Sequence, residues 1–402
     1  MDTQTHDKRS TEVIRLAPVP VLLPASSPRR LPRRPERARP SEFHRAFEDS
    51  ILYYDAFHYP DERILMIGPP PHNLSDLLKS ARYVALPSGK MLSSSLFPSR
   101  STMITELTGV PPGTDALLVR LDEQDVRVEV GSNYLESFAN SRLLFTINQN
   151  NALDWIRRWG LWHAQTQGTD AIVIFDNGSN TYSLGDLSAT LSGIPGISKI
   201  AVVSLPHKFG PLDHWVKAYH FWPRFLQISA TAIALRRFGL YANGLINCDI
   251  DELMWAVDSH VYDLARGSRH GVLRVPGRWI EAVAPDGPPP RDHLGFRYRL
   301  RDIRARLSPP KWVLDPSRAW VKSLSVHPYH HRVHRAPFGA RFMARGALFW
   351  HFKGINTNWK ENRASTVPFN PTEHIPDETW IAAMTREPDH DIKRPRTRAA
   401  GS

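Results

Sequence analysis

The sequence has almost no cysteine and no long hydrophobic run. Cys248 is the only cysteine among 402 residues, so the chain can form neither an internal disulfide nor a cysteine-rich zinc site. No apolar stretch approaches the roughly 18 residues that a membrane-spanning helix requires. Residues 16–25 are interrupted by prolines and follow acidic residues, which is not the order of a secretory signal. These absences predict a cytoplasmic protein.

Acidic residues are outnumbered, and most of the basic excess lies at the two ends of the chain. Against 40 Asp and Glu there are 51 Lys and Arg, which gives a formal net charge of +11. Residues 1–45 contribute +5 of this and residues 384–402 contribute +2, so the long central part carries only +4. A nucleic-acid-binding domain usually concentrates basic residues within its folded part, and we therefore expect no specific nucleic-acid partner.

Both basic ends are predicted to be disordered tails. Residues 1–45 and 384–402 are rich in Arg and Pro and show neither a helical nor a strand period. Two roles stay open for such tails: solubility, and weak peripheral contact with anionic lipid at the inner face of the membrane.

The residues between the tails divide where the sequence pattern changes. Residues 46–140 contain short apolar runs separated by Pro and Gly, which predicts a small β-rich domain. Over residues 141–383, strand-like runs alternate with helical spacing, which predicts an α/β domain with a mostly parallel, Rossmann-like sheet and helices on both faces. We expect its strands at 143–147, 171–175, 199–205 and 244–248, and its helices at 152–165 and within 213–238.

Three polar clusters follow the predicted strands, at residues 148–151, 176–179 and 249–252. Ligands of parallel sheets bind beyond the carboxyl ends of the strands, where these clusters are expected. Asp249 and Asp251 are two residues apart, so on an extended chain both carboxylates would point to the same side and could meet one divalent cation. The alternative for this pair is that both are ordinary solvated acids. The alternative for Asp176 is that it lies in a turn and caps the next helix.

Three segments together resemble the GT-A-fold glycosyltransferases of the family-two-like and family-ninety-two-like group. In that group, one strand leads into Asn-Glu and a helix with Trp and His, a second ends in Asp-Asn-x-Ser, and a later one ends in Asp-x-Asp-Glu. The matching segments here are 151–163, 175–179 and 247–252, and the resemblance covers about residues 142–363. The chain departs from the pattern at Ala152, where the group usually has Glu, and at Arg158, where an acid usually precedes the Trp.

The resemblance implies a metal-dependent hexosyltransferase that moves a sugar from a nucleotide-sugar donor to a glycan or lipid-linked acceptor. Asp249 and Asp251 would hold Mn²⁺ or Mg²⁺ against the donor diphosphate. His351, as first choice, or His327, as second, would complete the metal site. The residues expected to bind the nucleotide sugar are Asn148, Asn151, Asp176, Asn177, Asp249, Lys311 and Lys360.

An inverting transfer also needs a carboxylate that accepts the proton of the acceptor hydroxyl. Glu281 is the first candidate for this general base and Asp292 is the second, whereas a retaining mechanism would need neither. Because of the departure at Ala152, a second function stays open: a catalytically inactive GT-A-fold protein that binds glycans or acts as a scaffold.

Overall fold

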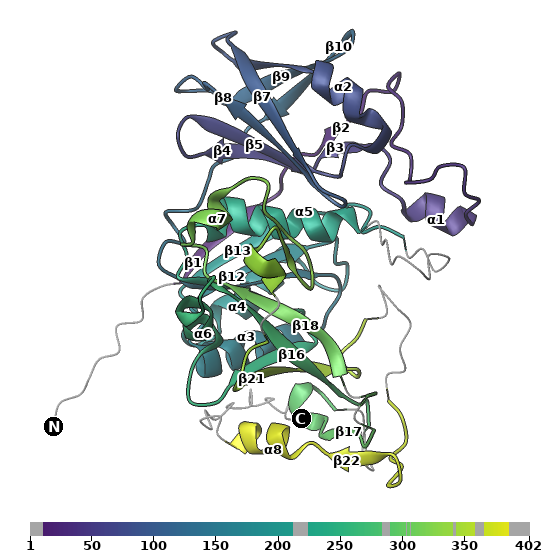
Figure 1. The fold of residues 1–402 in the computed structure, drawn as a ribbon, viewed down its shortest axis with the longest axis vertical. Helices are drawn as coiled ribbons and strands as arrows, with labels where there is room; N and C mark the ends of the chain where they lie inside the picture. Colours follow the sequence, from purple (N-terminus) through teal and green to yellow (C-terminus); the bar gives the residue numbers. More distant parts are fainter. Residues whose placement is uncertain are drawn as a thin grey trace, which may run out of the picture.

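The protein is built around two large β-sheets with a helix between them (Figure 1). The structure is a computed structural model, and it describes residues 11–211, 224–283, 290–302, 304–305, 307–340, 343–357 and 366–385. The smaller sheet has seven strands and the larger one has nine.

The smaller sheet is antiparallel throughout and lies within residues 46–140, where the sequence predicts β-rich structure. Successive side chains along its strands point to opposite faces, and both faces are buried. In β5, Ile64 and Met66 face one apolar cluster, and Leu65 and Ile67 face another. The short helix α2 (Ser75–Ser80) covers the first of these faces with Leu78. In spatial order the strands are β10 (Gln124–Glu129), β9 (Ala116–Leu121), β6 (Arg82–Leu86), β7 (Met91–Pro98), β8 (Met103–Thr108), β5 (Arg63–Gly68) and β4 (Asp55–Tyr59).

The larger sheet is mostly parallel, which confirms the α/β expectation. β1, β13, β12, β11 and β14 run parallel, whereas β18 is antiparallel to both of its neighbours, β21 is parallel to β16, and β15 is antiparallel to β21. In spatial order the strands are β1 (Glu12–Leu16), β13 (Lys199–Ser204), β12 (Ala171–Asp176), β11 (Arg142–Asn148), β14 (Gly244–Asn247), β18 (Leu307–Leu314), β16 (Val272–Ile280), β21 (Ala347–Phe352) and β15 (Glu252–Ala256).

Helices cover both faces of the larger sheet, as the two-faced burial of its strands requires. In β12, Ile172 and Ile174 face the cluster that contains Trp159 and Trp162 of α3. The helices on this face are α3 (Leu153–Gln167), α4 (Leu184–Ser192) and α6 (Val261–Gly267).

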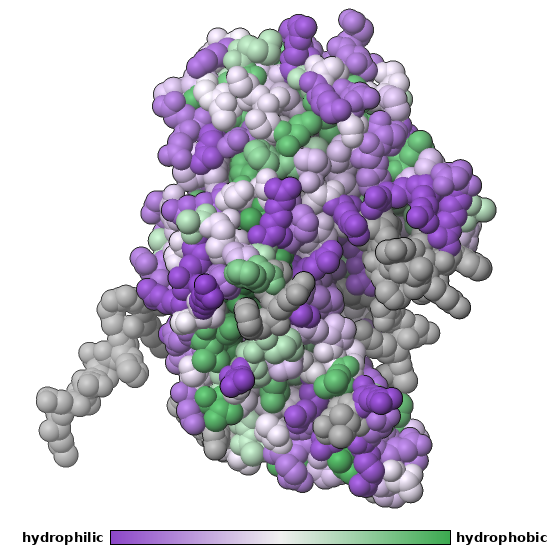
Figure 2. All heavy atoms as spheres, in the orientation of Figure 1, coloured by the Kyte–Doolittle hydropathy of each residue, from purple (hydrophilic) through white to green (hydrophobic). Residues whose placement is uncertain are grey.

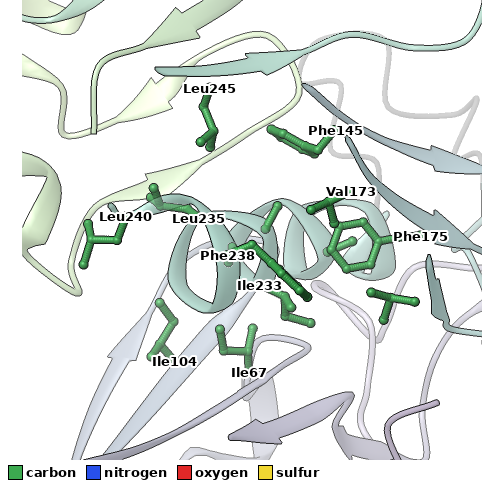
Figure 3. Packing of buried hydrophobic residues seen from close by; sticks show 14 of the residues in the cluster. Ile67, Ile104, Phe145, Val173, Phe175, Ile233, Leu235, Phe238, Leu240 and Leu245 are labelled. Atoms are coloured by element: carbon green, nitrogen blue, oxygen red, sulfur yellow. The ribbon is translucent and has the colours of Figure 1, made fainter. Parts of the chain in front are cut away.

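The opposite face of the larger sheet packs on α5 (Phe225–Ile233) and its π-helical continuation η2 (Ala234–Gly239). Figure 3 shows this helix between Val173 and Phe175 of the larger sheet and Ile67 and Ile104 of the smaller one. One apolar core is therefore shared by the two sheets.

Short elements complete the described part. They are β2 (Val21–Leu22), α1 (Ser41–Ala46), β3 (Ile51–Tyr53), η1 (His72–Leu74), η3 (His293–Gly295), β17 (Tyr298–Leu300), α7 (Ala319–Lys322), β19 (His327–Pro328), β20 (Val333–His334), η4 (Pro337–Ala340), β22 (His374–Pro376) and α8 (Glu378–Thr385).

The prediction of a disordered tail over residues 1–45 is wrong for residues 11–45. β1 pairs in parallel with β13 and so becomes the edge strand of the larger sheet. Arg30 is buried and donates hydrogen bonds to the carbonyls of Pro70, Glu48 and Ile51. This order comes from pairing with distant segments, which a local sequence period does not record. At the other end, α8 ends at Thr385, and the rest of the predicted tail lies outside the described residues.

Candidate functional site

A cavity of about 270 Å³ lies at the carboxyl ends of the parallel strands β11 and β14. This is the edge where ligands of parallel sheets bind. The described residues that line it are Ile147, Asn151, Arg224, Asp249, Ile250, Asp251, Trp279, Pro309, His330, His331, His351, Ile355, Asn356 and Thr357.

Asp249 and Asp251 both line the cavity, but the chain between them is a turn and not the predicted extended segment. The amide of Glu252 donates to the carbonyl of Asp249 over 3.0 Å. Because the chain turns here, the two carboxylates meet different partners. Asp249 Oδ2 lies 3.2 Å from Lys311 Nζ and 3.2 Å from His330 Nε2, whereas Asp251 Oδ2 lies 2.9 Å from His351 Nε2.

Asp251, Glu252 and His351 form a group that could hold a metal ion. Each offers one ligand atom, and these atoms lie within 4.8 Å of one another. Strand register brings them together: Glu252, the first residue of β15, is directly opposite His351 on β21. Carboxylate oxygens with one imidazole suit Mn²⁺, and the oxygens suit Mg²⁺. The donor set therefore fits a divalent cation, and it includes His351, the first-choice histidine.

Two neighbours orient the His351 ring. Trp279 of β16 is opposite His351 in the strand register and stacks on it, with ring centroids 3.8 Å apart. Ser308 Oγ lies 2.9 Å from His351 Nδ1. A hydroxyl can either donate to this nitrogen or accept from it, so Ser308 suits both tautomers of the ring. His351 Nε2 is thereby directed toward Asp251, and an outer partner of this kind is typical of metal-binding histidines.

Lys311 is fully buried beside the carboxylates, with its Nζ 2.9 Å from Glu252 Oε2. Burial by itself would lower the pKa of Lys311, but the nearby Asp249 and Glu252 carboxylates outweigh it, so the pKa lies above its usual value. Burial raises the pKa of the Glu252 carboxyl, and Lys311 opposes that rise. The carboxylates of Asp249, Asp251 and Glu252 thus lie close together, an arrangement that suits a divalent cation.

The cluster after β11 and β12 is a closed network of neutral amides and hydroxyls around one carboxylate. Asp176 Oδ2 accepts from Asn148 Nδ2 over 2.9 Å and from Ser179 Oγ over 2.6 Å, and Asp176 Oδ1 accepts from the Ser179 amide over 2.8 Å. Asn151 Nδ2 donates to Asn148 Oδ1 over 2.9 Å, and Asn148 Nδ2 also donates to Tyr182 over 2.8 Å. Buried polar groups need such partners, so this network holds the strand ends together.

Asn177 has a similar structural role, because its side-chain amide donates to the carbonyls of Leu205 and His207 after β13. Among the residues predicted to bind the nucleotide sugar, Asn151 and Asp249 line the cavity. Asn148, Asp176, Asn177 and Lys311 are not among the described residues that line it. Lys360 lies outside the described residues.

The two predicted general bases are engaged elsewhere in the described structure. Glu281 is buried, with carboxylate oxygens 2.8 Å from Lys353 Nζ. Asp292 pairs with Arg158 at 3.1 Å and caps η3 through the Leu294 amide. Neither is among the described residues that line the cavity. Arg158, which stands where the resembled group usually has an acid, thus forms an ion pair with Asp292.

His327, the second-choice metal ligand, is not part of the described metal-capable group. It lies on β19, is 1% exposed, and has a pKa lowered to about 3 by burial and by the nearby Arg236.

Sequence reasoning did not assign a role to Glu252, Ser308 or His330. For Glu252 a signal was present, since it directly follows Asp251 in the sequence. Ser308 and His330 carry no such signal, because strand register and the β19–β20 turn bring them to the site from distant positions.

Searches for related proteins give no family assignment: no protein-family model matches the chain, and no curated protein matches it. Among the described helices, none has the length and apolar character needed to cross a bilayer.

Proposed function

We propose that the protein is a metal-dependent glycosyltransferase of the GT-A type, which moves a sugar from a nucleotide-sugar donor to a hydroxyl of a glycan or lipid-linked acceptor. One observation carries the proposal: the Asp251, Glu252 and His351 group borders a cavity at the carboxyl ends of a mostly parallel sheet. The resemblance of residues 142–363 to this class of enzyme agrees with that placement.

A bound cation would suit the acidic part of the site to a diphosphate. The carboxylates of Asp249 and Asp251, which line the cavity, would repel a nucleoside diphosphate that carries no cation. When bound, Mn²⁺ or Mg²⁺ would supply the positive charge that stabilises the departing diphosphate. The protein's own contribution would be to orient the donor, with Arg224 offering guanidinium donors to phosphate oxygens from the cavity wall.

The transfer itself breaks the bond between the anomeric carbon and the phosphate oxygen, and the diphosphate keeps the electron pair. The acceptor hydroxyl oxygen forms the new bond to that carbon and loses its proton to a base. His331 is a poor candidate for this base although it lines the cavity, because burial lowers its pKa to about 2. Protonation of so weak a base at neutral pH is unfavourable.

A second function is favoured by the positions of Glu281 and Asp292. Since neither of these two carboxylates lines the cavity in the described structure, the same fold could bind a nucleotide sugar or glycan without catalysing transfer. The two functions differ in one observable: an enzyme consumes the donor, whereas a binding or scaffold protein is only stabilised by it.

The test is calorimetric titration of a nucleoside diphosphate with Mn²⁺, with Mg²⁺ and with chelator. Asp251→Asn removes a charged ligand with little change in volume, and we expect it to weaken metal-supported binding by at least the roughly 10- to 100-fold that loss of an outer-shell partner causes. His351→Ala should weaken Mn²⁺-supported binding more than Mg²⁺-supported binding, because imidazole favours the softer ion.

Two further variants should show an intermediate effect and no effect on metal-supported binding. Ser308→Ala leaves the ligands in place and should have an intermediate effect, and Asp258→Asn, at an exposed acid outside the cavity lining, should have none. Equal affinity of the unmodified protein in chelator and in Mn²⁺ would contradict metal-bridged donor binding. A screen of nucleotide sugars for Mn²⁺-dependent thermal shift, followed by product analysis, then separates the two functions: stabilisation without transfer or donor hydrolysis supports the non-catalytic one.

A further inference from the structure

The segment formed by residues 29–39, here called the Leu31 loop, presents an apolar side chain among arginines. Leu31 is 44% exposed. Arg29, Arg33 and Arg34, which flank it in the sequence, are also exposed.

The Leu31 loop is held in place by buried and polar contacts with the smaller domain. Asn73 Oδ1 accepts from the Leu31 amide over 2.7 Å, and Asn73 Nδ2 donates to the Arg29 carbonyl over 3.0 Å. His72 Nδ1 lies 2.8 Å from the Leu31 carbonyl. Together with the buried anchor Arg30, these contacts fix the backbone on both sides of Leu31, so its side chain stays at the surface.

The charge around Leu31 is predominantly positive. Residues 29–45 include seven arginines and two glutamates, and among the arginines Arg30 is the buried one. Arg39 donates to the carbonyls of Arg33 and Arg34 over 2.7 and 3.0 Å and so bends this basic segment back on itself. In Figure 2, hydrophilic residues gather on the part of the surface where Figure 1 places α1. The result is a compact basic surface with a leucine within it.

We propose that the Leu31 loop docks the protein on an anionic lipid bilayer. Arginines near an anionic leaflet are attracted by its surface potential. An exposed leucine gains free energy when it enters the boundary between headgroups and acyl chains, whereas it gains nothing from the phosphates of a nucleic acid. A surface that combines both kinds of residue therefore fits a membrane better than a soluble polyanion.

The docking surface is close to the cavity through a short chain of contacts. His72, whose ring lies against the Leu31 carbonyl, packs edge-on against Phe225 with ring centroids 5.6 Å apart. Phe47 also packs edge-on against Phe225, with ring centroids 5.6 Å apart. Phe225 begins α5, and the preceding residue, Arg224, lines the cavity. If the proposed function is right, docking at the Leu31 loop brings the cavity to a membrane and selects a lipid-linked acceptor.

The experiment is co-sedimentation of the full chain with phosphatidylcholine vesicles, with and without phosphatidylglycerol, in the absence of donor and metal. We expect binding only to the anionic vesicles. Arg33→Glu with Arg34→Glu should weaken it by about tenfold or more, because each reversed charge removes an attraction and adds a repulsion. Leu31→Ser, which keeps the backbone contacts, should weaken it severalfold.

The matched control is Arg266→Glu with Arg269→Glu. It makes the same change in net charge at two exposed arginines, one in the last turn of α6 and one just after the helix. This variant should bind the vesicles within about twofold of the unmodified protein, because it alters the net charge and leaves the Leu31 loop intact. Thermal unfolding checks that all variants are folded.

Three outcomes would overturn the proposal: no preference for anionic vesicles, equal losses in the control, or unchanged binding of Leu31→Ser together with equally tight binding of duplex DNA at the same salt. Because neither donor nor metal is present, failure of vesicle binding leaves the proposed transferase function untouched, and the converse also holds.

Discussion

Two polar clusters lie at the same carboxyl edge of the larger sheet, and they differ in how their charges are satisfied. Around Asp176, both carboxylate oxygens accept hydrogen bonds from neighbouring neutral groups. In the cluster around Asp251, the buried Lys311 ammonium pairs with the carboxylates of Asp249 and Glu252, Asp251 pairs with His351, and the group borders a cavity. Position at the edge of a sheet therefore does not by itself identify a ligand site. The second cluster differs from the first because it gathers several charged groups beside a cavity.

The largest effect is expected for Lys311→Met, which removes the ammonium that partly balances the charged cluster. Removing one partner of a buried ion pair typically costs about 3–5 kcal/mol, because the remaining charges stay buried. Urea unfolding measures this loss. The control Lys208→Met breaks a half-exposed pair with Asp49 and should cost less than about 1 kcal/mol.

Mn²⁺ sharpens this test. A cation bound by the native state should recover part of the stability that Lys311→Met loses, since binding to the folded state alone stabilises it. If Lys311→Met is as stable as the unmodified protein, or gains nothing from Mn²⁺, the charged cluster is organised differently from our description.

Acid should loosen the strand that carries Glu252. His163 of α3 is fully buried and neutral: its Nδ1 donates to the Trp159 carbonyl, and its Nε2 accepts from the amide of Met254 on β15. Burial lowers the pKa of His163 to about 4. The unfolded chain binds a proton near pH 6.5 and the folded protein does not, so stability is present above about pH 6.5 and is lost as the pH falls toward 4.

Because the pKa of His163 differs between the folded and unfolded states, this single histidine should lower the free energy of unfolding by about 2 kcal/mol at pH 5 relative to pH 7.5. Denaturant unfolding at several pH values is the measurement, and His163→Gln should flatten the acid slope. His44→Gln, at an exposed position, should leave that slope unchanged. A slope that His163→Gln does not alter would show that other groups cause any acid sensitivity.

The smallest effect on metal-supported binding is expected for Asp176→Asn in the closed network. The amide replaces one acceptor oxygen with a donor, so one hydrogen bond from Asn148 or Ser179 is lost, at a cost of about 1–3 kcal/mol. Metal-supported binding of a nucleoside diphosphate should change little. If calorimetry shows that this binding is lost while the variant stays folded, Asp176 contacts the donor and the contrast between the two clusters fails.

The sequence by itself determined the alternation of strands and helices in the larger domain and the polar residues at the strand ends. β11, β12, β13 and β14 lie where their apolar runs predict them, because a strand buried on both faces must be apolar along its length. The same pattern placed Asp249 and Asp251 at the ligand edge. These are local properties of the chain.

Only the tertiary structure decided which side chains meet. Strand pairing brings His351 beside Glu252, and the position of β18 places Lys311 between two carboxylates. Pairing with β13 also orders β1, a segment whose composition predicts disorder. Register and strand order depend on the packing of the entire domain, since the backbone of each strand could form its hydrogen bonds with any of several neighbouring strands. For that reason the sequence identified the aspartates of the site, and the fold supplied their partners.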